Sequence, residues 1–275
     1  ASKIESSSYY EIKAPSRTEL LNEESWDNAM FASANVQNWP EYKTKLNPGD
    51  TLFFKDIELW FVKGASNLAF EKLLEFIRTY GGKLNIYISC NIEFYKYVRK
   101  VTAFDNVLHS SIIIAPRSAE IATKELMHRH NSGGMKLMIG EKFLKQLPKR
   151  QQNKIVKKFH QRSNGTIGSA LYLWLANIVE VKGDTLYMKE PPITANPVIT
   201  NSDWLILLNE FVIHKEMTAE TALVIFKSQR KAVIRRSFTS LLRTGLLTER
   251  NEILTINPYA EMYVEEILRE NGIIS

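Results

Sequence analysis

The sequence has little cysteine and no long apolar run. It contains 275 residues with a single cysteine, Cys90, which excludes an internal disulfide and a zinc site built from cysteines. No apolar run approaches the roughly 20 residues that span a bilayer, and the polar stretch Ala1–Ser8 lacks the apolar segment of a signal peptide. With 44% hydrophobic and 24% charged residues, the composition predicts a soluble globular protein of a reducing compartment, the cytoplasm.

Two classes of enzyme site are also missing. No serine or cysteine stands in a recognisable partnership with a histidine and an acid, so no hydrolase triad is predicted. His128 and His130 suggest a metal site, but residues two apart lie on different faces of a helix.

The 36 Lys and Arg exceed the 30 Asp and Glu, for a net charge of +6. This mild excess permits nucleic acid or an anionic membrane as a partner but is common in cytosolic proteins.

The most informative stretch that is present is the apolar run from Thr51 to Phe61, which carries Asp56 and Glu58. An apolar run closed by acids is typical of a buried parallel strand. Such a strand brings carboxylates to the edge of an α/β sheet, where ligands bind. We therefore predict a strand at about 51–61 with its acidic end at a ligand site.

Strands and helices alternate on both sides of this run. The patterns predict strands at 9–13, 84–88 and 110–115, and helices at 23–34, 67–80 and 92–102. Asn22 and Asn67 are candidate caps for the first two helices. The alternation favours a parallel sheet. From Ser118 the pattern changes to helices alone, at 118–130, 141–160 and 168–179, followed by a short strand at 183–188 and a proline-rich linker at 191–197.

The last part of the chain has its own pattern. It predicts helices at 202–214, from 218 or 219, at 228–244 and at 259–271, with strands at 245–248 and 253–256 joined by a turn at 248–252. Three helices followed by a hairpin are typical of a winged helix. The third helix carries the cations that a recognition helix uses on phosphates, Lys227, Arg230, Lys231, Arg235 and Arg236. Its other face is apolar, and a role in protein contacts is the alternative.

This order of elements resembles the C-terminal half of an AAA+ P-loop ATPase, in the branch whose ATPase unit is followed by a winged helix. The resemblance covers about residues 48–275. It implies a partial parallel-sheet α/β core over 1–117, a helical lid over 118–192 and a winged-helix domain over 198–275.

The resemblance also implies roles for individual residues. Asp56 would end the Walker B strand and help to hold Mg²⁺, and Glu58 would polarise the attacking water. Asn91, directly after the next strand, would be the polar sensor that orients this water. Arg99 lies near the position of a finger that reaches a neighbouring subunit. Gly168 lies in the stretch 163–171, which resembles the second sensor helix but has no arginine there.

Two departures from the family pattern limit these expectations. Lys55 stands where the family has an acid beside Asp56, and the phosphate loop Gly-x-x-x-x-Gly-Lys-[Ser/Thr] occurs nowhere in the sequence. In the family this loop precedes the Walker B strand by a long interval, so here it would lie before Ala1, and the first residue is not Met. We therefore expect the C-terminal portion of a longer ATPase.

The intact protein would use ATP and Mg²⁺ as an ATP-driven switch or remodeller. It would contact a protein partner, or self-associate, through its ATPase core. This chain alone is expected neither to bind ATP tightly nor to hydrolyse it. Two alternatives remain: a winged-helix protein that binds nucleic acid such as DNA, and a degenerate ATPase that serves as a scaffold for protein interactions.

Overall fold

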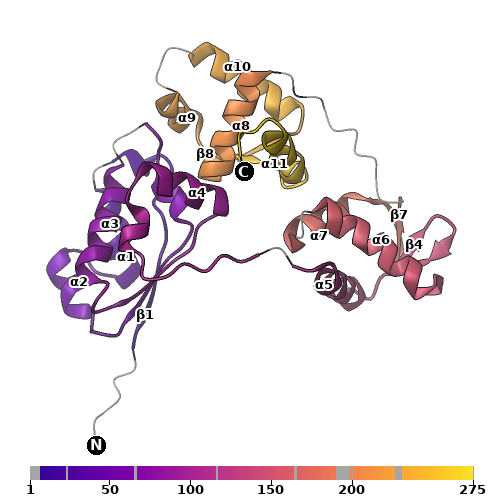
Figure 1. The fold of residues 1–275 in the computed structure, drawn as a ribbon, viewed down its shortest axis with the longest axis horizontal. Helices are drawn as coiled ribbons and strands as arrows, with labels where there is room; N and C mark the ends of the chain where they lie inside the picture. The colour runs from indigo at the N-terminus through magenta and orange to yellow at the C-terminus, as the bar shows by residue number, and fades with distance from the viewer. Residues whose placement is uncertain are drawn as a thin grey trace, which may run out of the picture. The chain divides into compact units, whose positions relative to one another are not determined.

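The computed structural model of the chain describes residues 7–22, 24–64, 67–115, 117–163, 166–189, 199, 201–226 and 231–274. The chain divides into two compact units (Figure 1). The first joins the residues up to Ile112 with Asn201–Ile256, and the second joins Ile113–Thr200 with Asn257–Ile273. No helix among the described residues is both long enough and apolar enough to cross a membrane.

A three-stranded parallel sheet organises the N-terminal part of the first unit. Its strands are β1 (Tyr9–Ile12), β2 (Thr51–Phe54) and β3 (Asn85–Ile88), in the order β1-β2-β3. The predicted mixed α/β organisation with a parallel sheet is therefore confirmed. The acidic strand is shorter than predicted, because β2 ends at Phe54 and the 3₁₀ helix η2 (Ile57–Trp60) follows. Asp56 and Glu58 thus lie in the turn beyond the strand.

Helices cover one face of this sheet. They are α1 (Ser25–Ala34), α2 (Trp39–Lys45), α3 (Leu68–Tyr80) and α4 (Ile92–Val101), with the short 3₁₀ helices η1 (Glu19–Leu21) and η3 (Phe104–Val107). Beneath them Phe54 of β2 is fully buried and lies against Trp26 and Phe76, with ring centroids 6.0 and 6.2 Å apart. Burying each such ring stabilises the fold by about 1.5–3 kcal/mol.

Two predicted helix caps differ from the structure. Helix α1 begins at Ser25, and its N-cap is Glu24 rather than Asn22. The side chain of Asn67 makes no capping bond to α3. Its Oδ1 instead accepts a hydrogen bond of 3.1 Å from the backbone N–H of Val62, so it fastens the loop before the helix.

The opposite face of the sheet is open. Side chains alternate along a strand, and Tyr9 and Tyr87 on this second face are 61% and 60% exposed. Strand β3 is an edge of the described sheet. The strand predicted at 110–115 is wrong, because these residues form no strand and Ile112 and Ile114 are 90% and 85% exposed. A strand exists only through hydrogen bonds to a neighbour, and no described strand pairs with this segment.

The C-terminal part of the first unit is a small helical domain with an antiparallel sheet. It contains α8 (Ser202–His214), β8 (Glu216–Met217), α9 (Ala219–Ile225), α10 (Lys231–Arg243), β9 (Leu247–Arg250) and β10 (Ile253–Ile256). The sheet order is β8-β10-β9. The hairpin turn is tighter than predicted: Asn251 and Glu252 both have positive φ, 51° and 65°, as a two-residue hairpin loop requires.

The second unit is not purely helical. Its elements are α5 (Ala119–Ser132), β4 (Lys136–Ile139), β5 (Lys142–Phe143), η4 (Leu144–Gln146), α6 (Lys149–Arg162), α7 (Ile167–Ala176), β6 (Ile178–Lys182), β7 (Thr185–Met188) and α11 (Glu261–Glu270). Strand β7 matches the predicted short strand, and Ser118 caps α5 as predicted. The expectation of helices alone before it is wrong, since β4 pairs with both β5 and β7. The predicted linker lies outside the described residues.

Candidate functional site

The turn after β2 is fastened to the end of the neighbouring strand β3. The backbone N–H of Asp56 donates to the hydroxyl of Ser89 at 3.0 Å, and that of Ile57 donates to the Ser89 carbonyl at 2.9 Å. Asp56 has a left-handed backbone with φ of 51°, a conformation that aspartate tolerates better than most residues. The segments that follow β2 and β3 therefore bring Asp56, Glu58 and Asn91 together.

Glu58 and Asn91 are in direct contact. The Glu58 carboxylate is almost fully buried, and its Oε2 accepts the backbone N–H of Asn91 at 3.3 Å. Burial raises the pKa of Glu58, and the nearby Asp56 charge adds to the rise. The side chain of Asn91 caps α4, because its Oδ1 accepts the backbone N–H of Phe94 at 2.6 Å.

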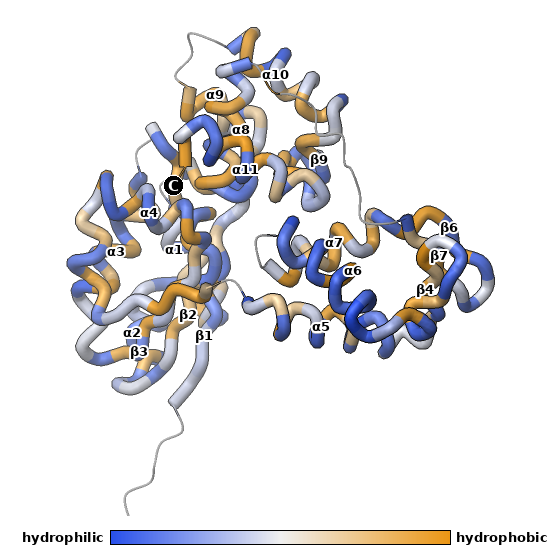
Figure 2. Tube along the Cα trace, turned by 45° about the vertical axis from the view of Figure 1, so that its right-hand side comes forward, coloured by the Kyte–Doolittle hydropathy of each residue, from blue (hydrophilic) through white to orange (hydrophobic). Residues whose placement is uncertain are grey.

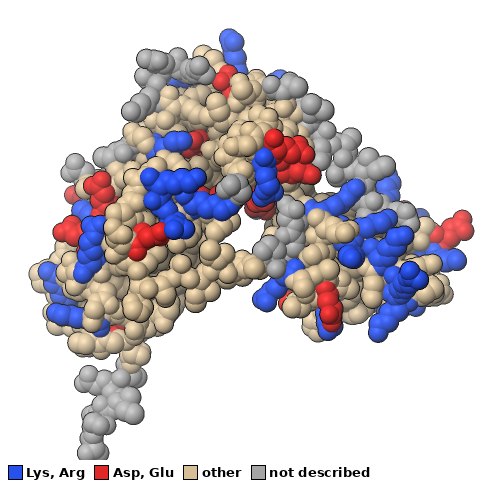
Figure 3. All heavy atoms as spheres, viewed as in Figure 1, with Lys and Arg blue, Asp and Glu red and all other residues tan. Residues whose placement is uncertain are grey.

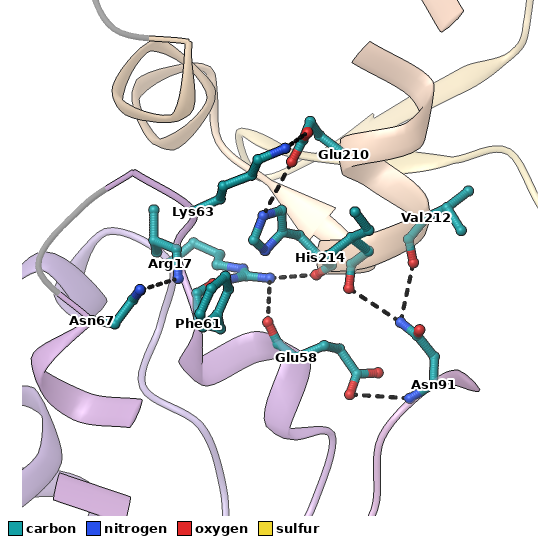
Figure 4. Close-up of polar contacts among 11 residues, drawn as sticks. Arg17, Glu58, Phe61, Lys63, Asn67, Asn91, Glu210, Val212 and His214 are labelled. Atoms are coloured by element: carbon teal, nitrogen blue, oxygen red, sulfur yellow. Dashed lines mark hydrogen bonds and ion pairs between the residues drawn. The ribbon is translucent and has the colours of Figure 1, made fainter. Parts of the chain in front are cut away.

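The amide group of Asn91 also reaches helix α8 of the C-terminal domain (Figure 4). Its Nδ2 donates to the carbonyls of Val212 at 3.1 Å and Ile213 at 3.3 Å. Carbonyls in the last turn of a helix have no partner within the helix. The preceding carbonyl, of Phe211, accepts the backbone N–H of Lys215 at 2.8 Å. Asn91 therefore supplies donors that the end of α8 lacks.

Arg17, in the loop after β1, makes further contacts between η2 and the end of α8. We call these contacts, with those of Glu58 and Asn91, the junction. Its buried guanidinium donates to the backbone carbonyls of Leu59 at 3.1 Å, Phe61 at 3.3 Å and Glu58 at 3.4 Å, and to that of His214. The His214 carbonyl is the last of helix α8. Burial lowers the pKa of Arg17 to about 10, against the opposing charges of Glu216 and Glu58. One cation thus joins η2 to the negative end of α8.

A second cluster of ionisable side chains involves Glu210 and His214 of α8. Lys63 Nζ is 2.5 Å from Glu210 Oε1, and His214 Nε2 is 3.5 Å from Glu210 Oε2. The His214 ring is 1% exposed and stacks on Phe61 with ring centroids 5.8 Å apart. Burial lowers the pKa of His214. Burial acts to raise the pKa of Glu210, but the nearby His214 and Lys63 side chains outweigh it and lower the pKa. The group is therefore a neutral imidazole beside a lysine–glutamate pair.

Asp56 is paired within the chain. Lys215, directly after α8, places Nζ 2.9 Å from Asp56 Oδ2. No group of three or more His, Cys, Asp or Glu side chains arranged to hold a metal ion is found within the described ranges. A magnesium ion has a carboxylate of the right chemistry at Asp56. It would have to displace the Lys215 ammonium to reach it.

The other predicted site residues take no part in the contacts described above. Arg99 is on α4 and its Nε is 2.6 Å from Asp105 Oδ2. Gly168 is in the first turn of α7, in the second unit. Lys231, Arg235 and Arg236 are exposed on α10. Lys227 and Arg230 lie outside the described residues.

Several residues of the junction were not predicted from the sequence. Glu210 and His214 are four apart in a mostly apolar helix, and this spacing was a usable signal because such residues share a helix face. Lys215 and Lys63 carry no comparable signal. Arg17 is 197 residues from His214 in the chain, and no local pattern connects them.

No known protein family and no curated protein matches this sequence. Among solved structures, the chain is similar to a variant of RuvB from Thermotoga maritima, with 9% identity, a TM-score of 0.39 and coverage of 96% of this chain and 78% of that chain. It is also similar to a Walker-type ATPase of Pyrococcus abyssi, with 11% identity, a TM-score of 0.33 and coverage of 95% and 84%. For Cdc6p from Pyrobaculum aerophilum the values are 12%, 0.31, 97% and 81%.

Proposed function

We propose that this chain is the C-terminal part of an AAA+ ATPase, in which the edge of the α/β core passes nucleotide state to the C-terminal domain. One observation carries this proposal. Asp56, Glu58 and Asn91 lie together beyond two adjacent parallel strands, and Asn91 also holds the end of α8. The carboxyl ends of parallel strands are where nucleotides bind in α/β sheets. A change at this edge would therefore act directly on α8.

The open sheet supports the proposal that the core is partial. Parallel sheets are normally covered on both faces, but here Tyr9 and Tyr87 are exposed and β3 is an edge of the described sheet. The apolar residues Ile112–Ile114 are 63–90% exposed. A further strand and helix would cover these surfaces. In our proposal they belong to the segment that carries the phosphate loop.

In the intact protein, Asp56 would hold Mg²⁺ and Glu58 would polarise the attacking water. Asn91 would orient that water, and ATP would be the cofactor. The raised pKa of the buried Glu58 carboxyl suits a group that accepts a proton. Binding of Mg²⁺ at Asp56 would release Lys215. Nucleotide binding would thereby loosen one of the contacts between the core and the residue that follows α8.

Calorimetric titration of ATP and Mg²⁺ into this chain tests the first part of the proposal, and no micromolar binding is expected. In a longer protein that includes the upstream phosphate loop, Glu58→Gln should lower ATP hydrolysis by roughly 10²–10⁴-fold, as loss of a general base does. Lys55→Gln is the matched control and should leave most activity. Micromolar ATP binding by the 275-residue chain would overturn the missing-loop part. Full hydrolysis by the Glu58→Gln protein would overturn the catalytic role.

A second candidate function, nucleic-acid binding, is favoured by the C-terminal domain. In this proposal the order α8-β8-α9-α10-β9-β10, with sheet order β8-β10-β9, is that of a winged helix. Lys231, Arg235 and Arg236 are exposed on α10, the position of a recognition helix. Retention on duplex DNA that weakens with salt and is lost in Arg235→Ala with Arg236→Ala would support this function. Absence of retention at low salt would rule out this function.

The third candidate is a degenerate ATPase that acts as a protein scaffold. The contacts of Asp56 with Lys215 and of Glu58 with Asn91 favour it, because both acids have partners without a nucleotide. The longer protein distinguishes it from the first candidate: a scaffold would neither bind nor hydrolyse ATP even with its upstream segment.

A further inference from the structure

Positive charge is concentrated in one part of the chain. Residues 113–189 contain fourteen Lys and Arg but only five Asp and Glu. This excess of nine is larger than the net charge of +6 of the whole protein, so the remaining residues are net acidic. In Figure 3, Lys and Arg side chains gather over the second unit. The positive charge of the protein is therefore concentrated in residues 113–189 and is not spread evenly along the chain.

Helix α6 contributes most of this charge. Its sequence from Lys149 to Arg162 contains no acid, and most of α6 is drawn in the hydrophilic blue in Figure 2. Ile155, Val156 and Phe159 are buried in the core of the unit. The exposed side chains are all cationic or amide-bearing: Lys149, Arg150, Gln151, Asn153, Lys154, Lys157, Gln161 and Arg162. We call these eight residues the α6 basic face.

The cations of the α6 basic face differ from three other lysines of the same unit. Lys124, Lys136 and Lys182 form ion pairs with Glu120, Asp184 and Glu180 at 2.7–3.0 Å. Within the described part of the chain, the Lys and Arg side chains of the α6 basic face form no ion pair. They therefore stand as uncompensated charge on one helix surface.

The start of α6 also conflicts with helix electrostatics. The N-terminal end of a helix carries positive partial charge and favours acids, but here Lys149 and Arg150 occupy the first turn and no side chain caps it. Arg150, Lys154, Lys157 and Gln161 then follow at spacings of four, three and four residues, which places them on one side of the helix. A bound polyanion would resolve both the repulsion and the missing cap.

We propose that the α6 basic face binds the phosphate backbone of duplex DNA without reading its sequence. Lys, Arg, Gln and Asn are the side chains that contact phosphates. Single-stranded nucleic acid would need exposed aromatic side chains for stacking, and α6 exposes none. A membrane surface would need the apolar face of the helix, which is buried here. This interface is separate from α10, on which nucleic-acid binding was proposed above.

Fluorescence anisotropy with a labelled duplex of about two helical turns, titrated with the full chain between roughly 50 and 200 mM salt, tests the proposal. Arg150→Gln, Lys154→Gln and Lys157→Gln together should weaken binding at least tenfold. They should also lower the salt slope by about 2.7, because each lost phosphate contact removes about 0.9. The matched control removes the same charge from the same unit through Lys124→Gln, Lys136→Gln and Lys182→Gln. It should weaken binding less than twofold.

Three outcomes would overturn the proposal. Absence of binding at the lowest salt is the first. Equal weakening by the two triple variants is the second, because bulk charge would then be sufficient. The third is unchanged binding in the α6 triple variant with loss in Arg235→Gln with Arg236→Gln, which would place the interface on α10. Thermal melting by circular dichroism establishes that each variant is folded, as its exposed substitutions predict.

Discussion

Substitution of Arg17 by methionine should detach helix α8 from η2 while both remain folded. Arg17 is 2% exposed and donates to four backbone carbonyls, three of them in the segment 58–61 and one at the end of α8. Methionine fills a similar space but donates nothing. The carbonyls would then be left without a donor in a buried site, where each unsatisfied group is costly.

The size of the effect follows from two opposing contributions. Four charge-assisted hydrogen bonds at the low end of their range, about 1.5 kcal/mol each, contribute roughly 6 kcal/mol. Burial of the charge opposes them: a fall in the pKa of Arg17 from its ordinary value to about 10 corresponds to about 3 kcal/mol. The difference is about 3 kcal/mol, the expected loss of unfolding free energy in Arg17→Met.

Urea unfolding followed by circular dichroism measures this loss, and hydrogen exchange of the backbone near α8 locates it. Arg17→Lys should lose nearly as much, because a compact ammonium cannot reproduce the forked geometry. Arg78→Met is the control on the exposed surface of α3 and should change stability by less than about 0.5 kcal/mol. The prediction would be refuted if Arg17→Met lowered stability no more than this control, or raised it. The buried guanidinium would then cost at least as much free energy as its hydrogen bonds contribute.

Three further predictions concern the same junction. Asn91→Ala should cost about 2 kcal/mol, since it removes both the N-cap of α4 and the donor to two carbonyls of α8. Asn91→Ser keeps a cap acceptor without placing a charge beside those carbonyls and should cost less, so equal losses in urea unfolding would contradict this division of roles. For His214, burial lowers the folded pKa below 6.5, so the unfolded state takes up a proton first. Stability should be full above about pH 6.5 and decline below it by at most about 1.4 kcal/mol per pH unit, and His214→Gln should flatten this decline in pH-dependent melts. Lys215→Ala should cost under about 1 kcal/mol, because its pair with Asp56 is half exposed; a larger loss would identify the pair as a structural anchor.

Elements with a strong local pattern were predictable from the sequence. Helix α8 has the predicted bounds, and α3 begins one residue after its predicted start. These helices were predictable because the signals that mark them, apolar residues at helical spacing and flanking glycines, lie within the segment itself. The run at 110–115 has an equally apolar pattern but forms no strand. A strand depends on a neighbour that its own sequence does not encode. The same limit explains why β4 and β5 were missed.

For the candidate site, the sequence determined which side chains are present at the ends of β2 and β3. The presence of Asp56, Glu58 and Asn91 near one edge of the sheet was predictable, because parallel strands end at one edge, but Asp56 and Glu58 were expected within the strand and lie beyond its end. Tertiary structure alone decided their partners. Lys215 on Asp56 and Arg17 on the end of α8 come from segments far apart in the chain. Such contacts depend on how whole helices and strands pack together. An unpaired carbonyl or a buried charge needs a partner, and the packing decides which side chain is close enough to supply it.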